Sequence, residues 1–302
     1  MYKRQPFEPR GYITDYYTDE AIKVIKKNKN RPFFLYLSHF APHNPLQALR
    51  DDYDHFHHIE GEFSEELKVY SGMLKALDRS VGRILDTLEK NNLTDNTLIV
   101  LTSDNGGANY IHLSDINKPY RGWKLTHFEG GLHVPFMAKW PNKIKPGIEF
   151  NAPIHANDIL PTFAAAAGAE LPDDRIIDGV NLLPFLQNHN SDMPHETLYW
   201  LQGRLQTVLH ENWKLITDHR TGKDWLFNVE SDPYERINLA SEMTLKVEEL
   251  KRLLNDHKKV QPPPLYDNTM SVPILIDKHN GYTFQDGDEF TYLSLIHISE
   301  PT

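Results

Sequence analysis

A run of apolar residues ends abruptly in a polar turn about one third of the way along the sequence. Residues 98–101 (LIVL) are typical of a buried strand, and the run SDNGG follows at residues 103–107. Ligands of open α/β sheets bind where strands end at their carboxyl edge, and a hard divalent cation prefers oxygen ligands such as those of Asp104 and Asn105. The alternative is an ordinary turn, which Asp, Asn and Gly also favour.

The order of elements around this turn predicts a mostly parallel sheet. Residues 33–37 (FFLYL) have the composition of a buried strand, and apolar residues recur every three or four positions between residues 63 and 88. The second pattern predicts one long amphipathic helix, which leads to the strand at residues 98–101. A strand, a helix and a second strand in this order imply a right-handed crossover between parallel strands.

Two shorter helices are also predicted. Thr18 is expected to be the N-cap of a surface helix, because acidic residues follow it in the first turn and lysines crowd the far end near residue 29. Residues 154–168 are rich in alanine and end at Gly168, a residue that commonly terminates helices.

The character of the sequence changes after residue 180. Short runs typical of strands and separated by turns predict a small antiparallel sheet; they lie at residues 198–200, 207–210, 213–217 and 225–228. A last amphipathic helix is expected to end near His257, with Leu245, Val247, Leu250, Leu253 and Leu254 as its apolar residues. Three prolines at residues 262–264 are expected to stop all regular structure. The fold class predicted is α/β, with a mostly parallel central sheet flanked by helices and a smaller C-terminal α+β subdomain.

Two basic side chains are candidates for chemistry, and one acidic cluster is not. His43 lies between two prolines after the first predicted strand, and such a rigid loop suits a general acid, although a lone histidine is usually an ordinary surface or core residue. Lys124 is either an exposed surface lysine or, if it shares a cleft with Asp104, a fixed positive charge for an anion. Residues 51–58 (DDYDHFHH) are expected to be a solvated loop, because their spacing fits no compact metal site.

Composition excludes several classes of function. The 302 residues carry a net charge of -10, which argues against nucleic-acid binding, and no basic stripe with interleaved aromatic residues offsets it. The sequence has no cysteine, so disulfides, thiolate zinc sites and cysteine nucleophiles are absent from it. No window has the length of a membrane span, and the first twelve residues lack the apolar run of a signal peptide.

Several motifs, in one order, resemble type I sulfatases across roughly residues 11–260. They are FLYLSHFAPHNPL, LIVLTSDNGG, YRGWKLTHFEGGLHVPFMAKWP, NDILPTFAAAAG, DGVNLLPFL, NWKLI and LFNVESDPYERINLA. The resemblance implies an α/β fold of the alkaline phosphatase type, with a smaller C-terminal domain in which a four-stranded antiparallel sheet packs on a helix.

The resemblance also implies roles for individual residues. Asp104 and Asn105 would bind calcium, while His43 and Lys124 would contact the sulfate and help protonate the departing oxygen. His112 and Tyr120 would line the substrate entrance. The reaction implied is attack on sulfur by the hydrate of formylglycine, an aldehyde made from a cysteine or a serine, and the substrates implied are sulfated sugars or aryl sulfates.

The sequence departs from the family pattern at the nucleophile. It contains no CxPSR or SxPSR motif, no early Asp-Asp pair and no Lys-x-His segment. We therefore expect the chain to be a C-terminal portion of a sulfatase, inactive alone, whose nucleophile and remaining metal ligands lie upstream. The expected divisions are a part of the catalytic domain (1–190), an antiparallel sheet with a helix (191–261), a tail (262–292) and a non-native tail resembling a translated sequencing adapter (293–302).

Two other functions are compatible with the same residues. A relative in the same superfamily that cleaves phosphonate or phosphate monoesters would share these residues, and so would a non-catalytic protein that binds sulfated glycans. The family resemblance favours a periplasmic, secreted or lysosomal location. Oligomeric state is not determined by the sequence.

Overall fold

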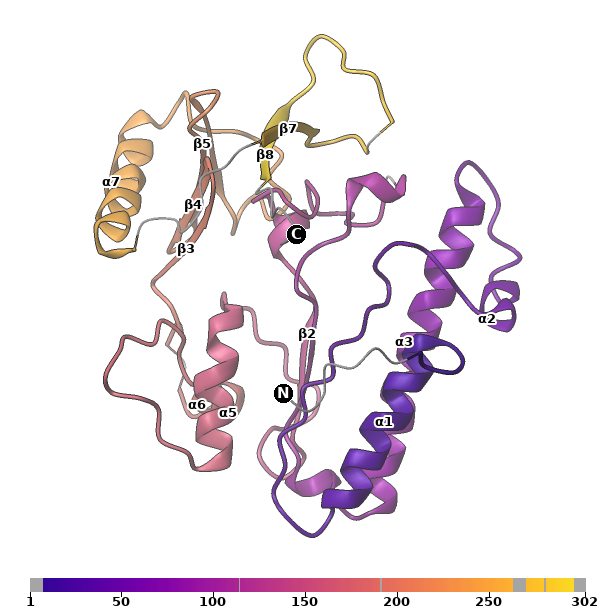
Figure 1. Cartoon of the computed structure of the whole chain (residues 1–302). Helices are drawn as coiled ribbons and strands as arrows, with labels where there is room; N and C mark the ends of the chain where they lie inside the picture. The colour runs from indigo at the N-terminus through magenta and orange to yellow at the C-terminus, as the bar shows by residue number, and fades with distance from the viewer. Residues whose placement is uncertain (1–7, 114, 191, 263–269, 280, 296–302) are drawn as a thin grey trace, which may run out of the picture. The chain divides into compact units, whose positions relative to one another are not determined.

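The computed structural model describes residues 8–113, 115–190, 192–262, 270–279 and 281–295 (Figure 1). The chain divides into two compact units, which are described separately. The first comprises Met1–Ile99, Ile111–Leu113 and Lys139–Lys143, and the second comprises Val100–Tyr110, Ser114–Ala138 and Ile144–Thr302.

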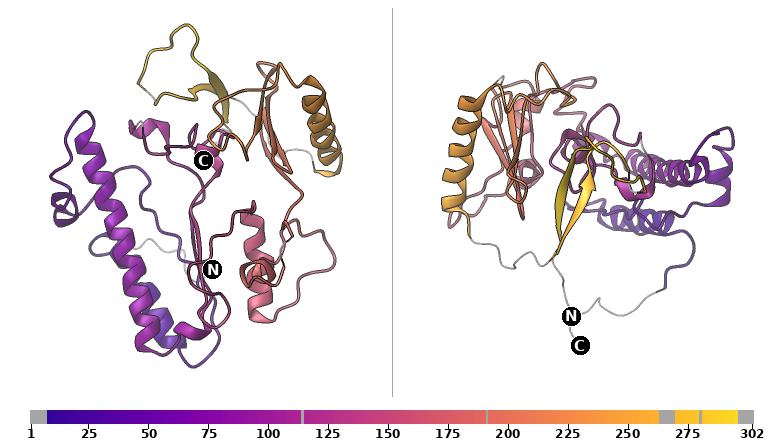
Figure 2. Two further views of the ribbon diagram at one scale, coloured as in Figure 1. Left: turned by 180° about the vertical axis from the view of Figure 1, so that it is seen from behind. Right: turned by 90° about the horizontal axis from the view of Figure 1, so that it is seen from above.

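Helices dominate the first unit. They are α1 (Ile13–Asn28), α2 (Arg50–Asp54), α3 (Ser64–Lys90) and the 3-10 turn η1 (Thr94–Asn96). Helices α1 and α3 lie side by side (Figures 1 and 2), with Ile25 of α1 and Ala76 of α3 fully buried. The long helix predicted from periodicity is confirmed as α3. Its predicted apolar face is only partly covered, because Leu67 and Leu74 are exposed.

The predicted start of the first helix is wrong. Helix α1 begins at Ile13, and Thr18 lies inside it rather than at its N-cap. The Thr18 hydroxyl donates to the carbonyl of Thr14 (2.7 Å), the usual bond of a hydroxyl inside a helix, and lies 2.6 Å from the hydroxyl of Ser80. Thr18 is thus a buried helix-packing residue.

The prediction of a buried strand at residues 33–37 is also wrong. The structure assigns no strand there, and the side chains alternate between half-buried and exposed. Phe34 is 73% exposed and Tyr36 is 80% exposed. None of the strands in the described residues pairs with this extended segment, and without a ladder partner its apolar residues have no sheet to share.

The central sheet within the described residues has two strands, β1 (Ile99–Thr102) and β2 (Phe136–Lys139). Strand β1 is half-buried, not buried as its composition suggested. Helix α5 (Ile159–Ala167) follows the 3-10 turn η3 (Ala156–Asp158), so it begins later than predicted, and it ends as predicted at Gly168, whose φ is 66°. The remaining short helices are η2 (Asn109–Ile111), α4 (Glu129–Leu132) and α6 (Leu183–Leu186).

The predicted C-terminal sheet is confirmed. Four strands pair in sequence order, each antiparallel to the next: β3 (Thr197–Gln202), β4 (Leu205–His210), β5 (Trp213–Asp218) and β6 (Lys223–Asn228). Helix α7 (Thr244–Val260) covers one face of this sheet (Figure 2), where its Leu250 packs with Val208 and Leu215.

Regular structure resumes after the prolines, contrary to the prediction. Strands β7 (Met270–Leu275) and β8 (Phe290–Leu295) form an antiparallel hairpin. Ile276, directly after β7, is fully buried in a cluster with Trp225 and Phe128, on the opposite face of the four-stranded sheet from α7. Helix α7 ends before the prolines, but the apolar residues after them form a strand and, at Ile276, pack into this cluster. Residues 296–302 of the predicted non-native tail lie outside the described residues.

Candidate active site

Strand β1 ends directly before the two predicted metal ligands. The Asp104 side chain is exposed and that of Asn105 is half-buried. In the described part of the chain, neither side chain hydrogen-bonds to another residue; the Ser103 hydroxyl donates to the backbone carbonyl of Asn105 (3.0 Å). A carboxylate and an amide oxygen are therefore both uncommitted at the end of the strand, and they are hard donors of the kind that calcium prefers.

The two glycines that follow allow a very close backbone approach. The amide of Gly106 donates to the carbonyl of Gly131 (3.1 Å). A Cβ atom at Gly106 would lie only 1.7 Å from the carbonyl oxygen of Gly130. No side chain fits in that space, so glycine is required at this position.

The backbone of Lys124 is bonded to the second of these glycines. Its amide donates to the carbonyl of Gly107 (2.9 Å). The Asn117 side chain accepts from the amide of Gly107 (2.7 Å) and donates to the carbonyls of Gly107 (2.9 Å) and Gly122 (3.0 Å). The structure thus fixes the backbone of the predicted cation beside the turn that bears the predicted metal ligands. Among the described residues, the Lys124 ammonium group has no hydrogen-bond or ion-pair partner.

A buried ion cluster lies at helix α4. The Lys214 ammonium lies 2.5 Å from Glu129 and 2.8 Å from Glu235, and Lys214 and Glu235 are fully buried. Burial alone would lower the pKa of Lys214, but the two carboxylates raise it above its ordinary value. Burial opposes ionisation of Glu129 too, yet attraction to Lys214 lowers its pKa to about 2, whereas burial raises the pKa of Glu235.

The predicted entrance residue Tyr120 belongs to an aromatic group near Glu129. Its ring stacks on that of His133, with centroids 4.5 Å apart, and lies edge-on to Tyr234 at 5.8 Å. His133 in turn places Nδ1 2.9 Å from Glu129 Oε2. Burial raises the pKa of Tyr120.

His43 lies in the first unit with its imidazole exposed. The Nδ1 atom donates to the carbonyl of Asn44 (2.7 Å), and the His43 amide donates to the carbonyl of Phe40 (3.0 Å). With Nδ1 committed to the backbone, Nε2 is the atom that can exchange a proton with a ligand. His112, in the same unit, has a φ of 63° and places its ring 5.9 Å from that of Phe63.

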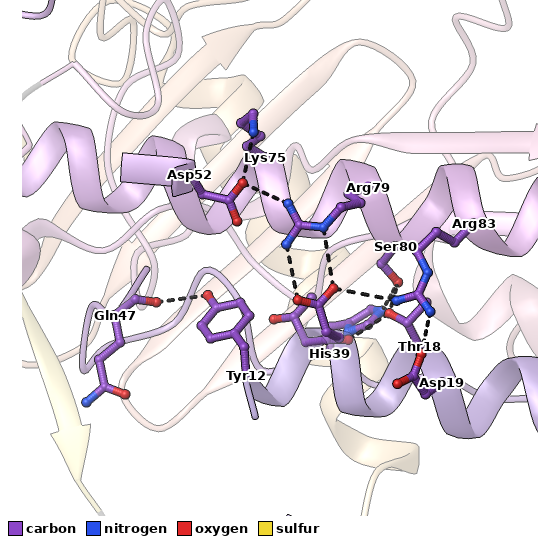
Figure 3. A network of polar contacts seen from close by, with 12 residues as sticks. Tyr12, Thr18, Asp19, His39, Gln47, Asp52, Lys75, Arg79, Ser80 and Arg83 are labelled. Carbon is purple, nitrogen blue, oxygen red and sulfur yellow. Dashed lines mark hydrogen bonds and ion pairs between the residues drawn. The ribbon is translucent and has the colours of Figure 1, made fainter. Parts of the chain in front are cut away.

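A polar network supports the segment that bears His43 (Figure 3). His39 Nε2 lies 3.0 Å from the Ser80 hydroxyl on α3, and burial lowers the pKa of His39. The Tyr12 hydroxyl donates to the carbonyl of Gln47 (2.8 Å), at the far end of the segment. Both contacts fix the loop between residues 38 and 47 on the helix pair.

The acidic residues expected in a solvated loop are not all solvated. Asp52 is 2% exposed, and its carboxylate accepts hydrogen bonds from Arg79 (2.7 Å) and Lys75 (2.9 Å) of α3 (Figure 3). The prediction fails for Asp52 because α2 turns it inward against α3. Within the described residues, no group of three or more His, Cys, Asp or Glu side chains could hold a metal ion.

Sequence reasoning did not find several residues that bond to one another or to the backbone near Lys124. Asn117, Glu129, Lys214 and Glu235 were not predicted. A signal existed for Lys214, because it is a lysine in an otherwise apolar strand, WKLI.

Solved structures define the class of fold. The crystal structure of Ps i-CgsB has a TM-score of 0.78 and 32% sequence identity, and the match covers 88% of this chain and 59% of that one. The same protein was solved with a neocarrahexaose. A second structure, BT4656 with D-glucosamine-2-N,6-O-disulfate, has a TM-score of 0.67 at 20% identity and shares the fold. These proteins have an α/β fold of the alkaline phosphatase type, so the predicted fold class is confirmed.

Sequence comparisons then give the family. The family model described as Sulfatase matches residues 1–169, and that described as N-sulphoglucosamine sulphohydrolase, C-terminal, matches residues 122–260. The chain therefore belongs to the sulfatase family.

The matched relatives are longer than this chain. An uncharacterized sulfatase, YdeN, of Escherichia coli is 38% identical over 69% of this chain and 37% of its own length. The steryl-sulfatase of Rattus norvegicus is 34% identical over 76% of this chain and 39% of its own length. The chain thus spans less than half of the length of either relative. No helix in the described residues is long and apolar enough to cross a membrane.

Proposed function

We propose that this chain carries part of the active site of a sulfatase, an enzyme that hydrolyses sulfate monoesters. The observation that supports the proposal is the backbone frame that places the Asp104 turn beside Lys124, through the 2.9 Å bond between the Lys124 amide and the carbonyl of Gly107. Among the described residues, the Asp104 carboxylate and the Lys124 ammonium have no partner. They have opposite charges, and the substrates of the family are anions.

Asp104 and Asn105 fit a calcium ion by the chemistry of their donors. Calcium takes about six to eight oxygen ligands, so these two side chains would supply only part of the coordination shell. When bound, the cation would polarise the S–O bonds of a sulfate group. The family uses a metal and formylglycine in general, and the assignment of calcium to these two residues belongs to the proposal.

Lys124 and His43 would act on the ester itself. The Lys124 ammonium is a fixed positive charge that would bind the sulfate oxygens as negative charge builds on them. His43 would donate a proton from Nε2 to the departing alcohol oxygen, since its Nδ1 is bound to the carbonyl of Asn44. His112 would contact the substrate at the entrance.

The formylglycine motif of the family does not occur in these 302 residues. The sequence has no cysteine and no SxPSR motif from which a formylglycine could be made. We therefore propose that the chain does not hydrolyse sulfate esters by itself and acts together with a segment that supplies the nucleophile and the remaining metal ligands.

The substrate class proposed is sulfated glycans or aryl sulfates. Two structural relatives were solved with sugar ligands, a neocarrahexaose and a disulfated glucosamine, and a sequence relative is named for steryl sulfate. A secreted, periplasmic or lysosomal location fits such substrates.

The test is to assay the complete gene product on matched sulfate and phosphate esters of one aryl alcohol. We expect calcium-dependent hydrolysis of the sulfate ester, at a higher kcat/KM than that of the phosphate ester. Preference for the phosphate or phosphonate ester would assign the protein to a phosphonate monoester hydrolase, the activity named for one structural relative that shares the fold. Binding of sulfated glycans without turnover would identify a non-catalytic protein.

A further inference from the structure

We propose that Lys214, on strand β5, is a positioning residue for the Asp104–Asn105 turn, and that it acts through Glu129 and Glu235. The proposal rests on the metal-binding role proposed for that turn. It gives the C-terminal subdomain a part in building the site, although Lys214 itself touches neither metal nor substrate.

The position of Lys214 indicates a specific role. It is buried to 1% exposure in a strand whose next two residues, Leu215 and Ile216, are fully buried and apolar. An apolar side chain would pack there without the desolvation cost of a charge. A buried lysine between two carboxylates is weak evidence for stability, because replacing all members of such a cluster by apolar residues is often neutral or stabilising. The presence of Lys214 therefore calls for another explanation.

The cluster is bonded directly to the backbone of α4. Glu235 accepts a hydrogen bond from the amide of Glu129 (2.6 Å), the first residue of the helix, while Lys214 holds the side chains of both acids. The helix has only four residues, too few to be stable alone, so these bonds determine where it lies.

The next two residues of α4 bond to the segment before Lys124 and to the turn that bears Asp104 and Asn105. The amide of Gly130 donates to the carbonyl of Arg121 (2.6 Å), and the carbonyl of Gly131 accepts from the amide of Gly106 (3.1 Å). Three successive residues therefore connect the ion cluster to the residue that follows Asn105.

The backbone along this connection is tightly packed. A Cβ atom at Gly130 would lie 2.4 Å from the carbonyl oxygen of Gly122, and one at Gly131 would lie 2.3 Å from that of Thr126. Backbone packed this closely transmits a displacement instead of absorbing it. Movement of Glu129 would therefore shift the partner of the Gly106 amide.

Hydrogen exchange tests the connection without requiring activity. We would compare the wild-type chain with Lys214→Met and with Lys251→Met, which removes another ion pair of the subdomain, 2.5 Å from Asp224. Lys214→Met should speed exchange in residues 104–108 and 121–131 by about tenfold or more, whereas Lys251→Met should not. Faster exchange confined to residues 205–228 would overturn the proposal.

A second variant covers the case in which Lys214→Met does not fold. Glu235→Gln keeps the size of the side chain and removes its charge, and it should speed exchange in residues 104–108 in the same way; unchanged exchange there would overturn the proposal. Calcium titration of the complete gene product by calorimetry adds a second readout. Loss of Lys214 should weaken calcium binding about tenfold, a size typical of residues that orient metal ligands.

The calcium titration also separates this proposal from the function proposed above. If the wild type and Asp104→Ala bind calcium equally, the proposed metal site is wrong, and with it the role of Lys214 in serving that site. If only the wild type and Lys251→Met bind tightly, both proposals stand. If Lys214→Met binds calcium as tightly as the wild type, the positioning role is wrong and the metal site remains.

Discussion

The ammonium group of Lys214 lies 2.8 Å from the carboxylate of Glu235, and both side chains are fully buried. The same ammonium group lies 2.5 Å from the carboxylate of Glu129, so it contacts two acids. The cluster joins the C-terminal sheet to the segment that carries Lys124. Its energetics and its structural role can be tested apart from each other.

Removal of the Lys214 charge should strongly destabilise the fold. Lys214→Met leaves two buried carboxylates without a cation, and we expect the free energy of unfolding to fall by about 3–5 kcal/mol. Urea denaturation measures this loss. Lys251→Met removes a partly exposed pair and should cost less than about 1 kcal/mol. Equal losses in the two variants would contradict the account of the buried cluster.

Gly106→Ala should disrupt the turn that bears the proposed metal ligands. The added methyl group would meet backbone atoms of Gly130 at 1.7 Å and 2.8 Å, and backbone cannot move aside as a flexible side chain can. We expect the variant to lose calcium binding and, in the complete gene product, sulfate-ester hydrolysis. Calcium titration and a steady-state assay would show it.

The matched control for this change is Gly82→Ala in helix α3. A Cβ atom there meets nothing within 4 Å, so the substitution should be neutral or stabilise by about 0.4–1 kcal/mol. Wild-type calcium affinity in the Gly106 variant would show that the close approach does not shape the metal site.

Acid should destabilise the fold through His127. Burial lowers the pKa of this histidine to about 3, with a further contribution from the charge of Lys214. Between pH 6.5 and 3 the unfolded chain binds a proton at this residue and the folded chain does not, so the free energy of unfolding falls as pH falls.

The His127→Gln variant isolates this contribution, because an amide can still hydrogen-bond to Thr207, which lies 2.9 Å from the imidazole. Between pH 7 and 5 the wild type should lose about 2 kcal/mol more than the variant, measured by urea denaturation at each pH. His58→Gln, at an exposed histidine, serves as the control and should follow the wild type. The same pH dependence in all three proteins would contradict the prediction.

Periodicity predicted the helices and strands whose apolar residues repeat at the period of the element itself. The apolar residues of α3 and the short runs of β3 to β6 were found because each repeats at the period of its own element. The assignment of Asp104 and Lys124 to one site stays a prediction, and the structure adds that the Lys124 amide bonds to Gly107 of the same turn.

Features that depend on distant residues were not predictable in this way. Residues 33–37 have the composition of a strand, but a strand also needs a neighbour to pair with. The hairpin of β7 and β8 follows three prolines, which end a helix without ending the fold. Lys214 and Glu235 meet Glu129 only after the chain has folded, so no local pattern connects them.

The helix pair of the first unit should depend on Arg79. Its guanidinium bonds to Asp52 (2.7 Å, Figure 3) and to Asp15 (3.2 Å), so it joins α3 to both α2 and α1. Loss of the arginine leaves Asp52 buried with Lys75 as its remaining partner. We expect Arg79→Met to lower the free energy of unfolding by about 2–3 kcal/mol in urea denaturation.

Arg50→Met is the matched control for Arg79. Arg50 is exposed and pairs with Asp54 one helical turn away, so its loss should change the free energy of unfolding far less than the loss of Arg79 does. If the two arginine variants were equally stable, the network around Asp52 would not be what holds these helices together.

The metal-binding role proposed for Asp104 can be tested with one substitution. In the complete gene product, Asp104→Ala should lose calcium binding and reduce kcat/KM for an aryl sulfate by at least about a hundredfold. Asp95→Ala removes another exposed acid nearby in the sequence and should leave both quantities unchanged. Wild-type calcium affinity and turnover in Asp104→Ala would contradict this role.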